Sequence, residues 1–310
     1  MKRFLAIALV LLLLCGCSSA PAEDTVPRTV PPEQMTTAAA AAPTEPEFGW
    51  RSGNGVTLYL NADGTYHTGW LDENGKRYYF DQSGILQTGW LTLEGKQYYF
   101  HPDGTMARGN VAIDGETFHF ASNGTKLLLV NPWTFLPEDY TPDLVEAENG
   151  YLVDRSCYED LMRMLSDCRA AGCNAQICSS YRDNDLQVYL YNRKVNYFLG
   201  LGYSEADAKK EAGTIIAVPG TSEHQLGLAL DLVDNSYWGL DEAQEDTPAQ
   251  KWLMANCWNY GFILRYPNEK SQQTGIIYEP WHYRYVGHTV ARELYESGQC
   301  LEEYLDNLTQ

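Results

Sequence analysis

The chain has 310 residues, 44% of them hydrophobic and 13% aromatic, enough for the core of one large domain or two ordinary ones. Its 41 acidic side chains outnumber its 22 Lys and Arg side chains, and the formal net charge is -19. This charge argues against nucleic acid, which selects basic faces, and against adhesion to anionic lipid through charge alone.

Residues 1–17 are predicted to be an export signal. Lys2 and Arg3 form its basic end, and the apolar run at residues 4–14 is too short to span a bilayer permanently. The following Cys15-Gly16-Cys17 resembles a bacterial lipoprotein box in which Cys17 is lipidated. An ordinary secretory signal is the alternative. Two acyl chains on Cys17 would anchor the chain stably to a membrane.

Residues 18–47 consist mainly of Ala, Pro, Thr, Ser and Glu. They contain almost no large apolar side chains, so burial cannot repay the entropy lost on ordering. We therefore predict a disordered tether between the signal and the rest of the chain.

Residues 48–127 repeat with a period of 20. Gly-Trp pairs begin at residues 49, 69 and 89, and Gly109-Asn110 is a degenerate fourth copy. Aromatic triplets follow the same step, as do the glycines Gly64, Gly84, Gly104 and Gly124. Each unit is predicted to be a short β-hairpin closed by Asp-Gly, Asn-Gly or Ser-Gly.

This array resembles cell-wall-binding repeats of the choline-binding type. In that family, aromatic side chains of neighbouring hairpins enclose a quaternary ammonium through cation–π contacts. The resemblance makes Trp70, Tyr79, Trp90 and Tyr99 the candidate wall-ligand residues. The alternative is a spacer whose aromatic residues only pack one hairpin on the next. Choline-bearing teichoic acid and bare glycan both remain possible ligands.

Residues 128–310 are predicted to form a second domain. Helices are expected at about 156–171, 184–199, 204–213, 247–260 and 289–297. Ser156, Asn184 and Thr247 stand at the starts of three of these, where they can cap the first turn. A short strand is expected at residues 175–180. Helices with a few short strands, without alternating βαβ units, favour an α+β fold with an antiparallel sheet.

The segment 219–231 places His224 seven residues before Asp231. Gly227 lies between them and allows the backbone to pass close to a crowded site. Ala229, Asp231 and Val233 alternate with leucines, so Asp231 is expected to project from one face of a strand and the leucines from the other. A surface turn that leads into a strand is the alternative reading of this segment alone.

Near the C-terminus, Glu279-Pro-Trp-His282 supplies a second imidazole and a second carboxylate. His224, Asp231 and His282 are ligand types suited to one tetrahedral Zn²⁺ with an open position. Glu279 is then available as the base for a water molecule in that position. A turn or a twisted strand end is needed to bring residues 279 and 282 to the same side.

Together, Ser222-x-His-x-x-Gly-x-Ala-x-Asp231 and Glu279-Pro-Trp-His282 resemble the VanY-type D-alanyl-D-alanine carboxypeptidases. This zinc peptidase group also contains the D-Ala-D-Ala dipeptidases. The resemblance covers roughly residues 130–300 and includes three further segments: Ser180-Tyr-Arg182, 261–267 and 281–287. It implies release of the terminal D-Ala from peptidoglycan stem peptides at the wall.

The resemblance also implies substrate contacts. Arg182 is expected over the zinc, where a guanidinium can hold a carboxylate or a developing oxyanion. Ser222 is carried over as a substrate-contacting hydroxyl, and Gln187 either contacts substrate or caps its helix. Trp281 and Tyr283 are expected to wall the pocket, with a role as core aromatic residues as the alternative.

Six cysteines follow the signal, at positions 157, 168, 173, 178, 257 and 300. Export permits disulfides, but six cysteines allow fifteen pairings and the sequence selects none of them. Cys178, close to Arg182, is an alternative nucleophile, which the metal-binding set makes unnecessary. His67, His101, His119 and His288 are not assigned to the metal.

The prediction is an extracellular, lipid-anchored enzyme that faces the cell wall. Other peptidases of the same group, a dipeptidase on free D-Ala-D-Ala or an endopeptidase of cross-links, are the nearest alternatives. A wall-binding adhesin with an inactive peptidase domain is the alternative from another class.

Overall fold

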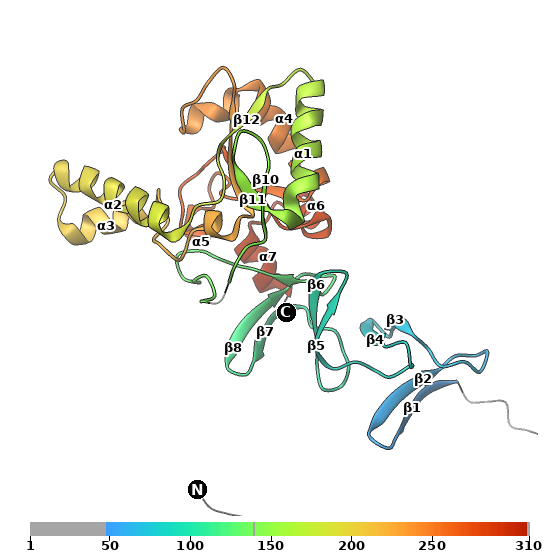
Figure 1. Cartoon of the computed structure of the whole chain (residues 1–310). Helices are drawn as coiled ribbons and strands as arrows, with labels where there is room; N and C mark the ends of the chain where they lie inside the picture. The colour runs from blue at the N-terminus through green and yellow to red at the C-terminus, as the bar shows by residue number, and fades with distance from the viewer. Residues whose placement is uncertain (1–47, 139, 309–310) are drawn as a thin grey trace, which may run out of the picture. The chain divides into compact units, whose positions relative to one another are not determined.

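The computed structural model describes residues 48–138 and 140–308 (Figure 1). The predicted signal, its Cys17 and the tether at 18–47 lie outside the described residues. Within the described residues, no helix combines the length and the apolar character needed to cross a bilayer.

The 20-residue repeats form antiparallel hairpins, as predicted. The strands of the four hairpins are β1 (Gly49–Gly53) with β2 (Val56–Leu60), β3 (Gly69–Glu73) with β4 (Lys76–Phe80), β5 (Gly89–Leu93) with β6 (Lys96–Phe100), and β7 (Gly109–Ile113) with β8 (Glu116–Phe120). A short strand, β9 (Lys126–Leu127), pairs with β8. In each of the first three hairpins, the Trp pairs with a Tyr of the opposite strand.

The turns that close these hairpins are not the ones predicted from the sequence. The first hairpin is closed by Asn54-Gly55, with φ of 52° and 78°, and Asn74-Gly75 closes the second in the same way. Positive φ at both central residues matches the twist of the flanking strands. Gly64, Gly84, Gly104 and Gly124 instead lie in the connections that lead out of each hairpin.

These connecting turns pack successive units together. Leu86 N–H donates to Thr57 O at 2.9 Å, and Met106 N–H donates to Arg77 O at 2.8 Å, so each connection bonds to the preceding hairpin. A Cβ on Gly104 would lie 2.4 Å from Leu86 Cδ2, whereas a Cβ on Gly64 would meet nothing within 4 Å. Gly104 is therefore required by the close approach of the preceding unit as well as by its backbone conformation.

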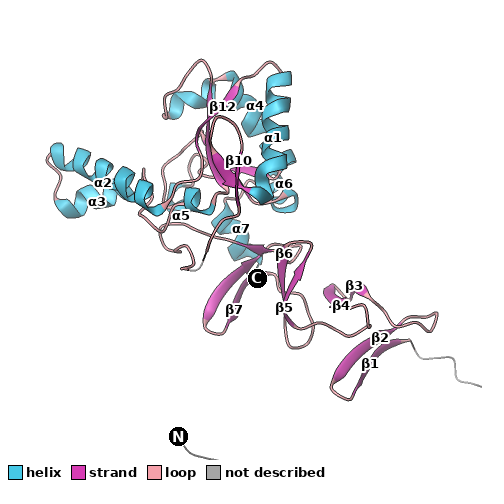
Figure 2. Ribbon diagram, viewed as in Figure 1, coloured by secondary structure: helices cyan, strands magenta, loops and turns pink. Residues whose placement is uncertain are grey.

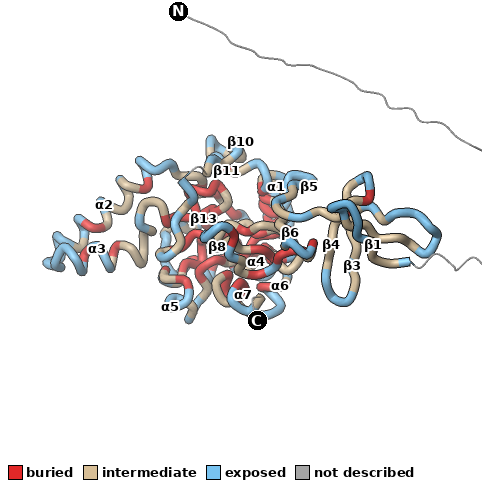
Figure 3. The backbone as a smooth tube through the Cα atoms, turned by 90° about the horizontal axis from the view of Figure 1, so that it is seen from below, coloured by how far each residue is buried: buried red, intermediate tan, exposed pale blue. Residues whose placement is uncertain are grey.

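The second region contains a four-stranded antiparallel sheet in the order β12-β13-β15-β14, which confirms the predicted α+β class. Its strands are β12 (Ala175–Ser179), β13 (Ala229–Asp234), β14 (Phe262–Leu264) and β15 (His282–Tyr285). A separate pair, β10 (Leu144–Glu146) and β11 (Leu152–Asp154), precedes it. Buried positions gather along β13 (Figure 3), where all six residues are buried.

Some of the helices pack against this sheet, whereas the pair α2 (Asn184–Gly200) and α3 (Glu205–Gly213) extends away from it (Figure 2). The other helices are α1 (Arg155–Ala170), α4 (Pro248–Asn256), α5 (Ser271–Thr274), α6 (His288–Ser297) and α7 (Leu301–Leu308), with 3-10 turns η1 (Glu223–Leu226), η2 (Glu242–Asp246) and η3 (Cys257–Tyr260). Thr247 caps α4 as predicted. Asp154 rather than Ser156 caps α1, and Asp183 rather than Asn184 caps α2.

The alternation in β13 separates the core from the site. Leu230 and Leu232 join the main hydrophobic core with Leu161 and Met164 of α1 and Leu253 of α4. Because neighbouring strand residues point to opposite faces, Asp231 faces away from this core. The sheet therefore carries its functional carboxylate on the face that α1 and α4 leave uncovered.

The packing at Gly104 yields a stability prediction. Gly64 and Gly104 have nearly equal φ, +82° and +81°, so alanine at either position incurs a left-handed backbone strain of about 1–2 kcal/mol. Gly104→Ala also forces Leu86 aside, which overpacks the junction and costs about 1–3 kcal/mol more. Urea unfolding of the two variants should show the larger loss for Gly104→Ala. Equal losses would contradict the packing role of this junction.

Candidate metal centre and active site

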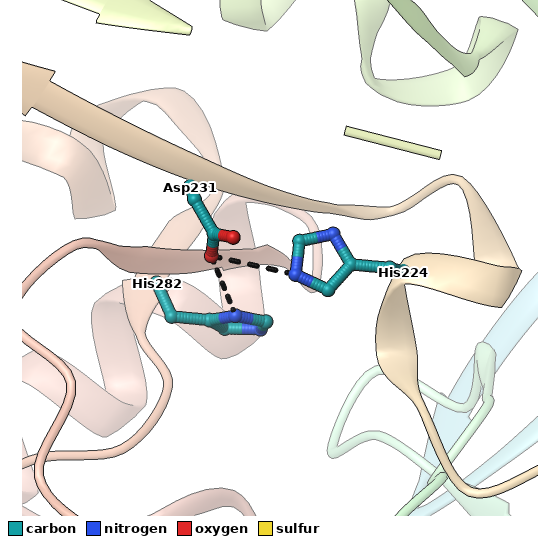
Figure 4. Close-up of side chains that lie close together, drawn as sticks. All are labelled: His224, Asp231 and His282. Atoms are coloured by element: carbon teal, nitrogen blue, oxygen red, sulfur yellow. Dashed lines mark hydrogen bonds and ion pairs between the residues drawn. The ribbon is translucent and has the colours of Figure 1, made fainter. Parts of the chain in front are cut away.

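His224, Asp231 and His282 converge from three elements (Figure 4). Asp231 and His282 are directly paired across the antiparallel strands β13 and β15, which places both side chains on one face. His224 lies in η1, just before β13. Ligand atoms of the three residues all lie within 4.8 Å of one another. The predicted metal set is therefore brought together.

Asp231 Oδ1 is the shared point of this cluster. It lies 3.3 Å from His224 Nε2 and 3.1 Å from His282 Nδ1. All three residues are buried, with exposed fractions of 2–3%. The two imidazole rings are almost perpendicular, with centroids 4.9 Å apart.

The backbone holds His224 in one tautomer. Its Nδ1 donates to Ser180 O at 2.8 Å, so its Nε2 presents a lone pair toward the cluster. Burial, reinforced by the Arg182 charge, lowers the His224 pKa to about 4 and keeps the ring neutral. Gly227 ends η1 with φ 72°, and a Cβ there would lie 3.0 Å from Asp154 N. The expected close backbone passage at Gly227 is confirmed.

The ligand atoms of these three residues suit a bound cation. The neutral Nε2 of His224 and the carboxylate oxygen of Asp231 are both acceptors, yet they face each other at 3.3 Å in a buried site. Two acceptors at this distance are unfavourable unless a positive centre lies between them. Two imidazole nitrogens and one carboxylate oxygen are the ligand types that Zn²⁺ takes in catalytic sites with an open position.

His282 is supported by Glu223, a residue to which the sequence assigned no role. Its Nε2 lies 3.5 Å from Glu223 Oε2, and neither atom has a hydrogen-bond partner among the described residues. Burial lowers the His282 pKa, but the hydrogen bond to Asp231 and the nearby Glu223 carboxylate outweigh this and raise it to about 9. The carboxylate thus orients the imidazole from the side opposite the metal set.

Two arginines balance the buried charge of Glu223. Its Oε1 accepts from Arg265 Nε at 2.8 Å and from Arg284 Nη1 at 2.7 Å. Burial alone would raise the Glu223 pKa, but both guanidinium charges hold it far below its ordinary value. Arg265 also forms two hydrogen bonds with Glu302 of α7, at 2.9 and 2.6 Å. Helix α7, which the sequence did not predict, therefore supports the metal site indirectly.

Glu279 lies beside the metal set without being part of it. The expected turn is present, because His282 N–H donates to Glu279 O at 3.1 Å. Glu279 Oε2 lies 3.7 Å from His282 Nδ1, and the residue is 6% exposed. Burial raises the Glu279 pKa to about 8. A carboxyl group that titrates near neutrality is suited to taking up and returning a proton.

Arg182 contacts the opposite oxygen of Asp231. Its Nη2 donates to Asp231 Oδ2 at 2.9 Å, and its Nε donates to Ser179 Oγ at 3.0 Å. Gln187 Oε1 accepts from Arg182 Nη1 at 3.4 Å. Several partners thus fix the guanidinium next to the metal set, the neighbourhood that the family resemblance implies for it.

The site opens into a cavity of about 500 Å³. Its inner part is lined by the metal set with Arg182, Ser222, Glu223, Tyr266, Glu279 and Trp281. The rest of the lining consists of Arg193, Lys194 and Tyr197 of α2 and the apolar side chains of Leu190, Ile215, Ile216, Ala217, Leu240 and Ile276. Ser222 and Trp281 therefore lie where the sequence predicted them. The ring of Tyr266 contacts that of His282 at a tilted angle of 42°, with centroids 4.7 Å apart, and the sequence did not single it out.

Two predicted substrate contacts do not reach this cavity. Tyr283 is fully buried in the core on the other face of β15, and its hydroxyl donates to Gln250 Oε1 at 2.7 Å. Gln187 is also fully buried, and its Nε2 donates to Ala217 O at 2.7 Å. Tyr283 is therefore a core residue, and Gln187 positions Arg182 instead of touching substrate.

Cys178 is unsuited to be a nucleophile. Burial raises the pKa of its thiol to about 12, so the reactive thiolate is not populated near neutrality. No disulfide links the six cysteines of the described residues.

The repeats form three aromatic corners, each built from two rings of one hairpin and one ring of the next. Trp70 meets Tyr79 at 5.1 Å and Tyr98 at 5.2 Å, and Trp90 meets Tyr99 at 5.3 Å and Phe118 at 4.9 Å. The first corner has the same form, with rings of Trp50, Tyr59 and Tyr78. The sequence identified the Trp–Tyr pairs at 70/79 and 90/99 but missed the ring contributed by the following hairpin.

Comparison with known proteins agrees with this geometry. The model of the VanY D-alanyl-D-alanine carboxypeptidase family matches residues 150–288. Models of a choline-binding repeat and of a cell wall binding repeat match residues 87–133 and 68–86. A D-alanyl-D-alanine carboxypeptidase of Enterococcus faecalis is 41% identical over 180 residues, covering 58% of this chain and 65% of that protein. The chain thus matches slightly less than two thirds of that relative's length.

Solved structures extend the likeness. A D,D-pentapeptidase VanY mutant from a VanB-type vancomycin resistance cassette, in complex with Zn(II), is 40% identical with a TM-score of 0.53, covering 57% of this chain and 97% of that one. VanYB in complex with D-alanine-D-alanine is 40% identical with a TM-score of 0.54, covering 58% of this chain and 96% of that one. The LD-carboxypeptidase LdcB is 30% identical with a TM-score of 0.53, covering 65% of this chain and 94% of that one. The chain therefore belongs to the VanY family of D-alanyl-D-alanine carboxypeptidases and carries choline-binding-type repeats.

Proposed function

We propose that this chain is a zinc-dependent D-alanyl-D-alanine carboxypeptidase that releases the terminal D-Ala of peptidoglycan stem peptides at the cell wall. The convergence of His224, Asp231 and His282 beside Glu279 in one cavity carries this proposal. The family supports it, since its solved members include a Zn(II) complex and a complex with D-alanine-D-alanine.

A zinc ion held by His224, Asp231 and His282 would supply Lewis acidity for a carbonyl oxygen and for a water molecule. Glu279 accepts the proton of the attacking water and returns it to the amine of the departing D-Ala. Arg182, held by Ser179 and Gln187, stabilises negative charge on the carbonyl oxygen without changing its own charge. The hydroxyl of Ser222 and the ring of Trp281 orient the substrate within the cavity.

The remaining segments would hold this activity at the wall. We assign residues 1–17 to a lipoprotein signal with Cys17 as the lipid anchor, residues 18–47 to the tether, residues 48–127 to wall binding and residues 128–310 to the peptidase. The aromatic corners suit the quaternary ammonium of choline on teichoic acid. Tethering raises the local concentration of polymeric substrate and thereby favours stem peptides over the free dipeptide.

The other peptidase activities differ in the bond that they cleave. A D,D-carboxypeptidase shortens a pentapeptide by one D-Ala, an L,D-carboxypeptidase shortens a tetrapeptide, and an endopeptidase separates cross-linked stems. Mass spectrometry of muropeptide products distinguishes them directly. An inactive adhesin is disfavoured because the metal set and Glu279 are all present and close together.

Replacement of the proposed base tests the mechanism. Glu279→Gln removes proton transfer while keeping the side-chain shape, so the rate of D-Ala release from a pentapeptide should fall about 10²–10⁴-fold. Zinc content should remain near one per chain, because Glu279 is not one of the three ligands. Glu296→Gln, on α6, is the matched control and should retain full activity. A fully active Glu279→Gln enzyme would refute the assigned base.

Proton release on zinc binding tests the ligand set. The raised pKa of His282, about 9, means that its ring is protonated at pH 7 in the metal-free protein and must lose that proton to bind zinc. Zinc affinity should therefore rise with pH, by about tenfold per unit between pH 6 and 8. Titration calorimetry in buffers of different ionisation enthalpy should show at least one proton released. Affinity that is independent of pH in this range would contradict the assignment of His282.

The aromatic corners differ in a way that choline binding can test. The Arg77 guanidinium lies 4.8 Å from the Trp70 ring centroid, and Lys126 Nζ lies 5.3 Å from that of Trp90. No Lys or Arg lies over the Trp50 ring among the described residues, and Glu73 accepts a hydrogen bond from Trp50 Nε1. Trp50→Ala should therefore reduce choline binding, measured by calorimetry, more than Trp90→Ala does. The reverse order would show that the chain's own cations do not compete for these rings.

A further inference from the structure

Helix α2 lines the outer part of the cavity with a positively charged stripe. Leu190, Arg193, Lys194 and Tyr197 all border the cavity. Their spacing of three and four residues places them on one face of the helix. Helix α2 packs beside α3 (Figure 1), and only α2 of this pair contributes residues to the cavity lining.

Neither cation of this stripe is neutralised. None of the ion pairs or hydrogen bonds found among residues 48–138 and 140–308 involves the side chain of Arg193 or Lys194. Each lies only near an aromatic ring, Arg193 5.8 Å from Tyr189 and Lys194 5.7 Å from Tyr197. Helix α2 has no acidic residue after Asp185. Among the described residues, Arg193 and Lys194 are the cations that line this cavity without an ion pair.

The acids of the cavity all belong to its inner end and are already engaged. Glu223 is paired with two arginines, Asp231 with Arg182 and the two imidazoles, and Glu279 is buried beside His282. The cavity therefore has a charge gradient, with the reaction centre at its inner end and unpaired positive charge at its outer end. An anionic group of a bound substrate would be drawn to that outer end.

Helix α2 sets the distance between the inner and outer ends of the cavity. Gln187 touches Arg182 beside the metal set, and Arg193 and Lys194 follow six and seven residues later on α2. At 1.5 Å per residue this is about 9–10.5 Å along the helix. An extended peptide advances about 3.3 Å per residue, so this separation corresponds to about three residues.

We propose that Arg193 and Lys194 form a subsite for a free carboxylate about three residues to the N-terminal side of the scissile bond. This inference rests on the proposed carboxypeptidase function and specifies its substrate. In a stem pentapeptide that ends in D-Ala-D-Ala, the group in reach is the free carboxylate of an acidic second residue. Amidation of that carboxylate removes its charge and leaves the two cations without a partner. The enzyme therefore discriminates acidic from amidated stems.

Two synthetic pentapeptides test this proposal, identical except that the second residue carries either a free carboxylate or its amide. Partly exposed charge pairs are individually weak, so two of them give a modest preference. We expect kcat/KM for D-Ala release to be about fivefold to thirtyfold higher for the acidic peptide, mainly through a lower KM. The preference should shrink at high salt. In Arg193→Gln/Lys194→Gln, the acid-to-amide ratio should fall to about one.

The control is Lys209→Gln/Lys210→Gln on α3. It removes the same charge from the neighbouring helix, at exposed residues that do not line the cavity. This variant should keep the acid-to-amide ratio of the unmodified enzyme. Equal kcat/KM for the two peptides, or the same loss of preference in both double variants, would overturn the subsite alone. Failure to release D-Ala from either peptide would overturn the proposed function together with it.

Discussion

The carboxylate of Asp231 is the point on which the site depends. One of its oxygens faces both imidazoles, and the other accepts from Arg182. A buried carboxylate would normally be driven to protonate, yet its neighbours hold its pKa well below the ordinary value. The pairing of β13 with β15 supplies the geometry, because register alone places His282 opposite Asp231. A one-residue slip would turn one of these side chains into the hydrophobic core.

A second layer of buried charge maintains this arrangement. Glu223 faces His282, Arg265 and Arg284 face Glu223, and Glu302 of α7 completes the chain of ion pairs. Such networks contribute little net stability, because desolvation opposes the Coulombic gain, but removal of one member strands the others. We therefore regard this network as a positioning device for one imidazole. It explains why two fully buried arginines lie under a metal site.

Much of this site could be predicted because local patterns specify it. Alternation in residues 228–233 placed Asp231 opposite the leucines, the turn at Glu279 followed from the need to bring it to the side of His282, and Thr247-Pro248 marked a helix start. The role of Glu223 could not be predicted in this way, since its partners Arg265 and Arg284 lie 42 and 61 residues away. Tyr283 was ambiguous for the same reason: only the pairing of β15 decides which face it occupies.

Prediction of the repeat structure from the sequence was limited in a similar way. Their period was evident, but each unit contains two glycine turns, and the sequence alone did not show which turn closes a hairpin. Strand pairing decides this, and it assigns closure to Asn54-Gly55 and its equivalents. The sequence predicted only two of the three rings of an aromatic corner, because the third ring comes from the next hairpin.

X-ray absorption spectroscopy of the zinc-loaded protein tests the central claim most directly. Our account predicts only nitrogen and oxygen ligands at about 2.0–2.2 Å, with the outer-shell scattering of two imidazoles. A sulfur ligand at about 2.3 Å, or the signature of a single imidazole, would contradict a metal held by His224, Asp231 and His282.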